Sequence, residues 1–445
     1  MIDAMPPPSS ADHAGSVRAR DAARPRAAGL VTLALLALVP VVFARGTGDA
    51  FEPPKAALLA TGAAILLAFA LAGEFSRVER LGPRAWWGSL AARTWSSLRA
   101  DPLGGCVLLF LFSATLSTLL SIRPGLSVFG APGRPAGLVT AWSTAAVYFA
   151  SRSVASSPRW LPRIALATGL AAAAACAYAL VQLAGLDPIG WVRTATFDGR
   201  WRVPGTLGHP NHLGAYLAMA LPLVLLLAQR ARSRAARGAW IALAAVALLV
   251  VALTLSRGAW VGLAAGAVAY AALSRVRVTR RGLAVALAAA GIFLLPLLTP
   301  MGAGLLTRLR QVADTRAETT QTRLQMWRAG LRMLADHPVT GVGTDAFVAA
   351  YPRYRTPDSW QAEWAAIATK AHDELIQIAA TQGGIGLLAA LLVVVLATGT
   401  LVRVSRAADG NTRREPTISY LIPPHKQLPF NIRILRYREN SPAAA

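Results

Sequence analysis

Long apolar stretches alternate with short polar segments along most of this 445-residue chain. A helix that crosses a bilayer needs roughly 17 to 25 apolar residues. Stretches close to this length lie at 27–44, 56–73, 103–120, 136–151, 164–184, 213–228, 239–255, 259–273, 282–299 and 384–402. Runs such as Ala171–Ala175 do not alternate, which argues against the strands of a membrane barrel. The pattern predicts an all-α polytopic membrane protein with about ten transmembrane helices, because helices pair their backbone groups internally in lipid.

Composition and charge refine this picture. Hydrophobic residues make up 55% of the chain, which is high for a soluble domain. The net charge of +24 suggests a nucleic-acid partner, but the distribution of the charges along the chain argues against one. Twenty Lys and Arg precede the first stretch or follow the second, fourth, sixth and eighth, against eight in the short segments between. The richer segments are expected to be cytoplasmic. We therefore expect a cytoplasmic N-terminus, basic residues that contact membrane lipids, and no nucleic acid.

Three regions follow along the chain. Residues 1–26 are rich in Pro, Ala and Arg and are expected to form a disordered cytoplasmic N-terminus. Residues 27–402 form the transmembrane domain, with a large exterior loop at about 300–383. Residues 403–445 form an atypical cytoplasmic tail, whose last part is either disordered or a product of truncation or a reading-frame change.

The large exterior loop contains helical patterns of its own. Apolar residues recur at helical spacing from Thr320 to Ala335, and Pro338 ends that helix. Thr344 is expected to cap a short helix. A further helix is expected from Asp373 onward into the last span. The loop is either an amphipathic cap on the bundle or a lid over a site at the membrane surface.

Arginine and histidine residues at the exterior ends of spans are the candidate chemical groups. Arg202 and Arg257 offer planar forks of donors that suit diphosphate oxygens, or they reach lipid headgroups instead. His372 precedes a helix start, and a neutral histidine there can accept a proton from a hydroxyl. The alternative is a structural histidine. His209 and His212 are expected to shape their loop and cap the sixth span.

Five motifs in order resemble the O-antigen ligase/polymerase superfamily of bacterial envelope enzymes, over about residues 100 to 402. They are Ser121–Gly130 with Arg134–Gly137, the segment Arg202–Asn211, the Leu255–Gly258 hairpin, Arg323 and Trp327 with Asp336–Gly343, and His372 with Gly383 and Gly386. Asp373 stands where these ligases usually have Asn, Ser or Gln. Relatives commonly have about twelve spans.

The resemblance implies a GT-C-like fold and metal-independent glycan transfer at the periplasmic face of the bacterial inner membrane, without a cofactor. The donor is a polyprenyl-diphosphate-linked glycan, and the acceptor hydroxyl belongs to lipid A-core, another glycan or a protein. His372, Arg257 and Arg202 are the implied catalytic residues. Asn211, Arg134, His209 and Arg323 are the implied substrate-binding residues, and no residue is assigned to a metal.

Three alternatives remain open at this point. An O-antigen-type polymerase or a protein O-oligosaccharyltransferase would share the same motifs with a different acceptor. A glycolipid transporter or flippase would place charged residues in mid-span, whereas the ten stretches carry almost none.

Overall fold

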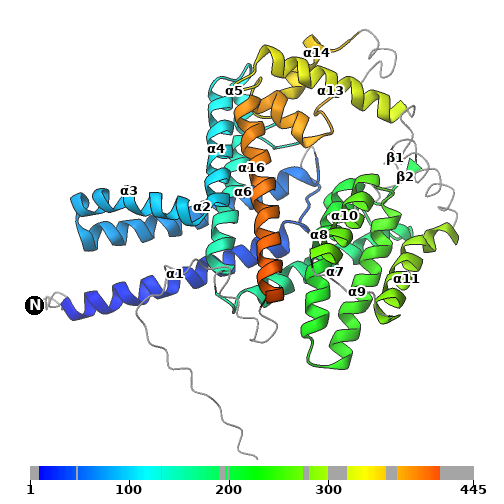
Figure 1. Cartoon of the computed structure of the whole chain (residues 1–445), viewed down its shortest axis with the longest axis horizontal. Coiled ribbons are helices and arrows are strands. Elements are labelled where there is room, and N and C mark those ends of the chain that lie inside the picture. Colours follow the sequence, from blue (N-terminus) through cyan, green and yellow to red (C-terminus); the bar gives the residue numbers. More distant parts are fainter. Residues whose placement is uncertain are drawn as a thin grey trace, which may run out of the picture.

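The computed structural model describes residues 10–46, 49–131, 133–155, 157–189, 196–197, 200–273, 280–298, 318–356 and 368–410. Most of this part is helical (Figure 1). Turns and loops connect the helices, and β1 (Thr196–Phe197) forms a two-stranded antiparallel ladder with β2 (Arg200–Trp201). The prediction of a predominantly α-helical protein is therefore confirmed.

The helices follow the apolar stretches closely. In chain order they are α1 (Ser10–Leu38), α2 (Glu52–Leu81), α3 (Pro83–Ala100), α4 (Pro102–Leu119), α5 (Pro124–Phe129), α6 (Leu138–Ala155), α7 (Leu161–Leu183), the 3-10 turn η2 (Gly205–Leu207), α8 (Pro210–Arg230), α9 (Arg234–Leu253), α10 (Arg257–Leu273), α11 (Arg280–Leu294) with the 3-10 turn η3 (Leu295–Leu298), α13 (Glu318–Asp336), α14 (Phe347–Tyr354) and α16 (Glu374–Gly410). Each of the ten predicted spans overlaps one of these helices.

Six described helices are long and apolar enough to cross a membrane: α2, α4, α7, α8, α9 and α16. The chain is therefore a multi-pass membrane protein by helix length and composition. The helices α10 and α11 have 17 and 15 residues, which is short for a bilayer core. The count of ten spans stays a prediction.

The first helix begins earlier than composition suggested. Residues 10–26, which we expected to be disordered, belong to α1. Alanine, the best helix former, recurs through this segment and outweighs Pro25 inside the helix. The tail at 411–445 lies outside the described residues.

The helices α7, α8 and α9 and the start of α10 share one hydrophobic core cluster. Ala172, Ala175 and Ala179 line the α7 side, and Leu213 and Leu217 of α8 are fully buried against it. Small residues let helices approach closely in lipid, where van der Waals packing drives association. This bundle fixes the starts of α8 and α10 relative to each other.

The last helix, α16, packs along α4 and is broken at Gly383, where φ is 67° and ψ is −161°. The break frees backbone carbonyl groups that a regular helix would pair. The Ala380 carbonyl accepts from Val342 N at 2.9 Å, and the Thr381 carbonyl accepts from Gly343 N at 3.1 Å. Ser117 of α4 also donates to Thr381 O at 2.5 Å. A broken helix at this depth is tolerated because protein groups satisfy its backbone.

The large loop folds onto the start of α16. Met333 of α13 and Phe347 of α14 are buried in one cluster with Ala380 of α16. The predicted helix that ends before Pro338 is confirmed by α13. The prediction that Thr344 caps the next helix is wrong. Its hydroxyl donates instead to Ala114 O of α4 at 3.0 Å, so it ties the loop to the bundle.

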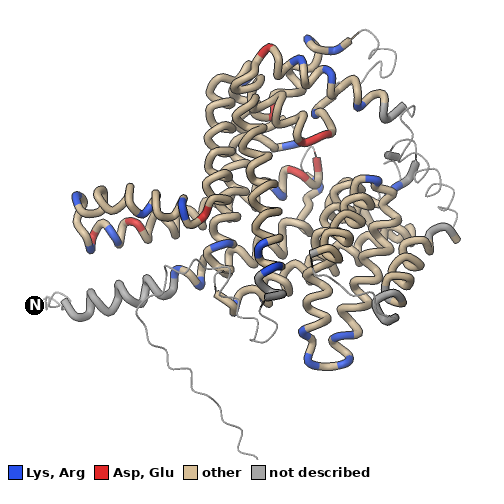
Figure 2. Tube along the Cα trace, viewed as in Figure 1, with Lys and Arg blue, Asp and Glu red and all other residues tan. Residues whose placement is uncertain are grey.

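Charged residues mark the two ends of α8. Figure 2 shows Lys and Arg concentrated at the α8–α9 connection and acidic residues near the start of α16. Arg230 ends α8 and Arg234 begins α9. The start of α8 is about 30 Å away, at 1.5 Å per residue. The arginine-rich connection and the loops around the α8 start therefore lie at opposite ends of this helix.

Candidate functional site at the converging helix starts

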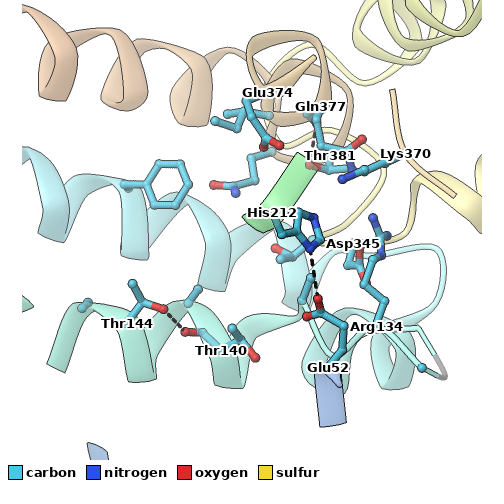
Figure 3. A pocket seen from close by; sticks show the side chains of 18 of the residues that line it. Glu52, Arg134, Thr140, Thr144, His212, Asp345, Lys370, Glu374, Gln377 and Thr381 are labelled. Carbon is cyan, nitrogen blue, oxygen red and sulfur yellow. Dashed lines mark hydrogen bonds and ion pairs between the residues drawn. The ribbon is translucent and has the colours of Figure 1, made fainter. Parts of the chain in front are cut away.

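A cavity of about 760 Å³ lies where four helices begin. Its lining comes from the starts of α2, α6, α8 and α16, together with the loops at 133–136 and 344–345 (Figure 3). The polar side chains that line it are Asp49, Glu52, Arg134, Thr140, Thr144, Tyr148, His209, His212, Thr344, Asp345, Lys370, Glu374, Gln377, Thr381 and Gln382. Residues from four segments that we predicted on the exterior face, at about 45–55, 121–135, 185–212 and 300–383, thus meet at one cavity.

The other wall of the cavity is apolar. Val107, Phe110 and Leu111 contribute from α4, and Ala141 and Ala145 contribute from α6. Val107 lies twelve residues before the end of α4, so this wall reaches about 18 Å along that helix. The cavity therefore combines a charged mouth with an apolar interior.

Arg134 is held at the mouth by the large loop. Its guanidinium forms an ion pair with Asp345 and donates to Thr369 O at 3.0 Å. Asp345 also accepts from Ala131 N at 3.0 Å. Burial raises the pKa of Asp345 above its usual value, although Arg134 acts in the opposite direction. The predicted substrate-binding residue Arg134 therefore lines the cavity as half of a buried charge pair.

Two buried polar atoms at the cavity make no hydrogen bond to the part of the chain that the structure describes. They are Nε of Arg134, a donor, and Oε1 of Gln382, an acceptor. A buried polar group without a partner costs roughly 1 to 3 kcal/mol. Both residues line the cavity, so a ligand with hydrogen-bonding groups would remove this cost.

Glu52 and His212 face each other across the mouth (Figure 3). His212 Nδ1 lies 3.4 Å from Glu52 Oε1. Asp49 fixes the start of α2 by accepting from Phe51 N at 2.7 Å and from Glu52 N at 3.1 Å. The pair thus joins the first turn of α2 to the first turn of α8.

Arg202 and Asn211 form a second polar cluster beside the cavity. The Arg202 side chain donates to Asn211 Oδ1 at 2.8 Å and to Thr254 O at 2.7 Å. Arg202 is only 4% exposed, so it does not reach for lipid headgroups. His209 caps α8 by accepting from Asn211 N at 3.1 Å, and it lines the cavity. The expected capping role of His209 is confirmed.

Arg257 is the first residue of α10 and is partly buried. It follows Thr254 by three residues, so the Arg202–Thr254 bond places the start of α10 beside the start of α8. The structure therefore gathers Arg202, Asn211 and the Ser256–Gly258 turn into one neighbourhood, although Arg257 does not line the cavity.

His372 lies at the rim, between the cavity residues Lys370 and Glu374, and its side chain is exposed. Both neighbours of His372 are pinned. Ala371 N donates to Gln377 Oε1 at 2.8 Å, and Asp373 caps α16 by accepting from Ile376 N at 3.0 Å. Asn and Ser can serve as the same cap, so the unusual Asp373 preserves this local geometry.

The pinned backbone forces His372 to φ +55°. Leu255 and Asp345 are the other non-glycine residues with positive φ among those described. Such conformations cost about 1 to 3 kcal/mol and tend to occur at functional sites. All three lie in segments that the sequence singled out: the α9–α10 turn, the large loop and the α16 start.

Arg323 lies on α13, is partly buried and does not line the cavity. One turn further along, Trp327 Nε1 donates to Ala371 O at 3.1 Å. Through this bond α13 supports the segment that carries His372, which gives the Arg323–Trp327 motif a positioning role in the fold.

Sequence reasoning missed several cavity residues, above all Glu52, Asp345 and Lys370. Two of them, Lys370 and Glu52, could have been noticed in the sequence. Arginine outnumbers lysine 42 to 3 in this chain, so a retained lysine such as Lys370 was notable. Glu52 is an acidic residue at the edge of a predicted span. Asp345 had no signal, because only the folded loop brings it to Arg134.

A comparison with known protein families supports the resemblance found in the sequence. Residues 242–391 match the family model described as O-antigen ligase. This region of the chain belongs to the O-antigen ligase-like superfamily, which confirms the predicted resemblance. The match spans α9 to the first part of α16 and includes the motifs of Arg257, Arg323 and His372. No curated protein matches the chain.

Proposed function

We propose that this protein transfers a glycan from a polyprenyl-diphosphate carrier to an acceptor hydroxyl at the periplasmic membrane face. The observation that carries the proposal is the two-part cavity, whose charged mouth continues into an apolar wall on α4 and α6. A substrate with a polar head on a hydrocarbon chain suits both parts. The match to the O-antigen ligase family supports ligase- or polymerase-type activity in general.

The positive ends of helices favour the diphosphate. α2, α6, α8 and α16 begin at the cavity, and α10 begins with Arg257 beside them. Each helix start favours an anion by roughly 0.3 to 1 kcal/mol. A few such contributions are too weak to hold a diphosphate alone. Arg202 and Arg257 supply the permanent charge that stabilises the leaving group.

In the proposed reaction the acceptor oxygen attacks the anomeric carbon of the donor. A C–O bond forms there, the bond from that carbon to the diphosphate oxygen breaks, and polyprenyl diphosphate leaves with the electron pair. The hydroxyl proton passes to a base. His372 orients or deprotonates the acceptor at the cavity rim, and Arg134, His209 and Asn211 contribute to substrate binding. No metal is required if arginines neutralise the diphosphate.

Arg257→Ala and His372→Ala should each abolish transfer without unfolding the protein. The assay uses purified protein in phospholipid nanodiscs, mixed with envelope membranes from a strain that lacks the gene, which supply donor and unmodified acceptor. Mass spectrometry of glycolipids and glycoproteins then identifies the product. We expect a loss of at least about 100-fold, the usual cost of removing one charge-stabilising donor.

Arg232→Ala and His337→Gln are the matched controls. Arg232 lies in the α8–α9 connection at the far end of α8, and His337 follows α13 away from the cavity. Both should retain wild-type transfer. Full activity in the Arg257 and His372 variants would end their proposed roles. A deletion strain with unchanged surface glycans would end the proposed function.

A further inference from the structure

We propose that His212, positioned by Glu52, is the base that accepts the proton of the acceptor hydroxyl. The inference rests on the proposed function and narrows it, because it leaves to His372 the orienting role at the rim. Neither His212 nor Glu52 belongs to the motif residues that the family resemblance assigns.

The first argument is location. His212 and Glu52 both line the cavity, and His372 lies at its rim. A general base must come within hydrogen-bond reach of the proton that it removes. Thr140, Thr144 and Gln377 line the same cavity and offer hydroxyl and amide partners for a saccharide. The pair is therefore placed where a hydroxyl-rich acceptor would bind.

The second argument is the geometry of the pair. Nδ1 of His212 lies 3.4 Å from Glu52 Oε1, so the opposite ring nitrogen, Nε2, is the one left for a ligand. A carboxylate in this position fixes the tautomer of the imidazole and stabilises the imidazolium that forms after proton uptake. Glu52 is held by the first turn of α2, and His212 by the first turn of α8.

The third argument is electrostatic balance. The start of α8 disfavours a positive charge on His212, since the helix dipole is positive there. Glu52 offsets this effect directly. Three other acidic groups at the mouth favour an imidazolium: Asp49, Asp345 and Glu374. Three basic groups oppose it: Lys370 and Arg134 at the mouth and Lys55 of α2. His209 packs 5.1 Å from His212 between ring centroids.

The fourth argument is proximity to the leaving group. Asn211, which accepts from Arg202 at 2.8 Å, directly precedes His212 on α8. The first turn of α8 thus links the arginine assigned to the diphosphate and the base assigned to the acceptor. In the proposed step the proton moves from the acceptor oxygen to His212 Nε2, while the diphosphate leaves toward the arginines.

The test is transfer by His212→Gln and Glu52→Gln in the nanodisc and envelope-membrane assay. His212→Gln should lower kcat by about 100-fold or more with little change in KM for the donor. A base must be neutral to accept a proton, so the wild-type rate should fall as the medium becomes acidic, and His212→Gln should remove that fall. Glu52→Gln should cause a smaller loss of kcat.

His337→Gln and Glu79→Gln are the matched controls. Glu79 lies at the opposite end of α2, is exposed and does not line the cavity. Both controls should keep the wild-type rate and pH profile, and thermal unfolding should show all four variants folded. If His212→Gln does not fold, an unchanged kcat and pH profile in Glu52→Gln overturns the proposed role of the His212–Glu52 pair.

The outcomes separate the two proposals. Transfer by wild type with an unchanged rate and pH profile in His212→Gln overturns the role of this pair alone. Absence of transfer by the wild-type protein overturns the proposed function and this role with it.

Discussion

At the residue scale, the site depends on side chains that are held rather than free. Arg202 is fixed by Thr254 and Asn211, and Arg134 is fixed by Asp345 and Thr369. Preorganised donors are worth more than mobile ones, because they need no reorganisation when charge develops in the transition state. Arginine abundance therefore says little by itself; the buried arginines with defined partners are the informative ones.

Asp345 gives the site a pH dependence. Its pKa is raised by burial, so it takes up a proton above the pH of about 3.9 at which ordinary aspartates titrate. Protonation removes the charge that holds Arg134, and donor KM should rise as pH falls. The measurement is donor KM against pH for wild type and Asp345→Asn, which should resemble the acid form at every pH.

The stability effect of Asp345 has the opposite sign. With a pKa raised in the folded state, the folded chain binds this proton more tightly than the unfolded chain. The contribution of Asp345 to stability therefore increases as pH falls through its folded pKa. The measurement is the midpoint of thermal unfolding against pH for wild type and Asp345→Asn, and the wild-type midpoint should gain on that of the variant as pH falls through this pKa. A relative loss of wild-type stability over that range would contradict the assigned pKa direction.

At the element scale, the break in α16 organises the large loop. The segment 338–343 pairs with 380–384 through the freed carbonyls, and Gly384 N donates to Pro338 O at 2.7 Å. Gly341 lies so close to Thr381 that an added Cβ would meet its carbonyl carbon at 2.4 Å. Gly341 and Gly383 thus have a physical reason in their motifs, because they let the two backbones approach each other at the cavity.

Gly383→Ala should destabilise the protein by about 1 to 3 kcal/mol or more. Its φ and ψ lie in a region that essentially only glycine adopts, and an added Cβ would meet Val339 C at 2.4 Å. Gly399→Ala is the control on the same helix, with nothing within 4 Å of the added Cβ. It should be neutral or stabilise by up to about 1 kcal/mol. Thermal unfolding in detergent measures the stability of both variants. Equal unfolding midpoints for the two variants would contradict the requirement for glycine at the break in α16.

At the scale of the whole molecule, the even-numbered predicted spans share one direction. α2, α6, α8 and α16 begin at the cavity, and α10 begins beside Arg202. This is the arrangement expected if successive spans cross the bilayer in alternate directions. The charge pattern assigned the cavity side to the exterior, and that assignment stays a prediction.

Single-cysteine labelling tests the sidedness. In a background without Cys106 and Cys176, a membrane-impermeant maleimide should label Gly258→Cys and Thr369→Cys from the periplasm. Arg232→Cys, at the opposite end of α8, should react only after the membrane is opened. Labelling of Gly258→Cys and Thr369→Cys from different sides would exclude a shared site.

The sequence alone determined where the apolar helices lie along the chain. Apolar length predicted the helices, Pro338 predicted the end of α13, and the motif order predicted the superfamily. These features are local, so they can be read one segment at a time. The same local reading failed at Thr344, whose hydroxyl bonds to α4 instead of capping α14.

Only the tertiary structure decided which side chains meet. Glu52 and His212 are 160 positions apart, and Arg134 and Asp345 are 211 apart. No spacing in the chain encodes such contacts, because they depend on how whole helices pack. The fold places His212 in the cavity lining and His372 at the cavity rim, and it joins Arg202 to Asn211. Local physics thus set the helices, whereas packing between distant helices created the site.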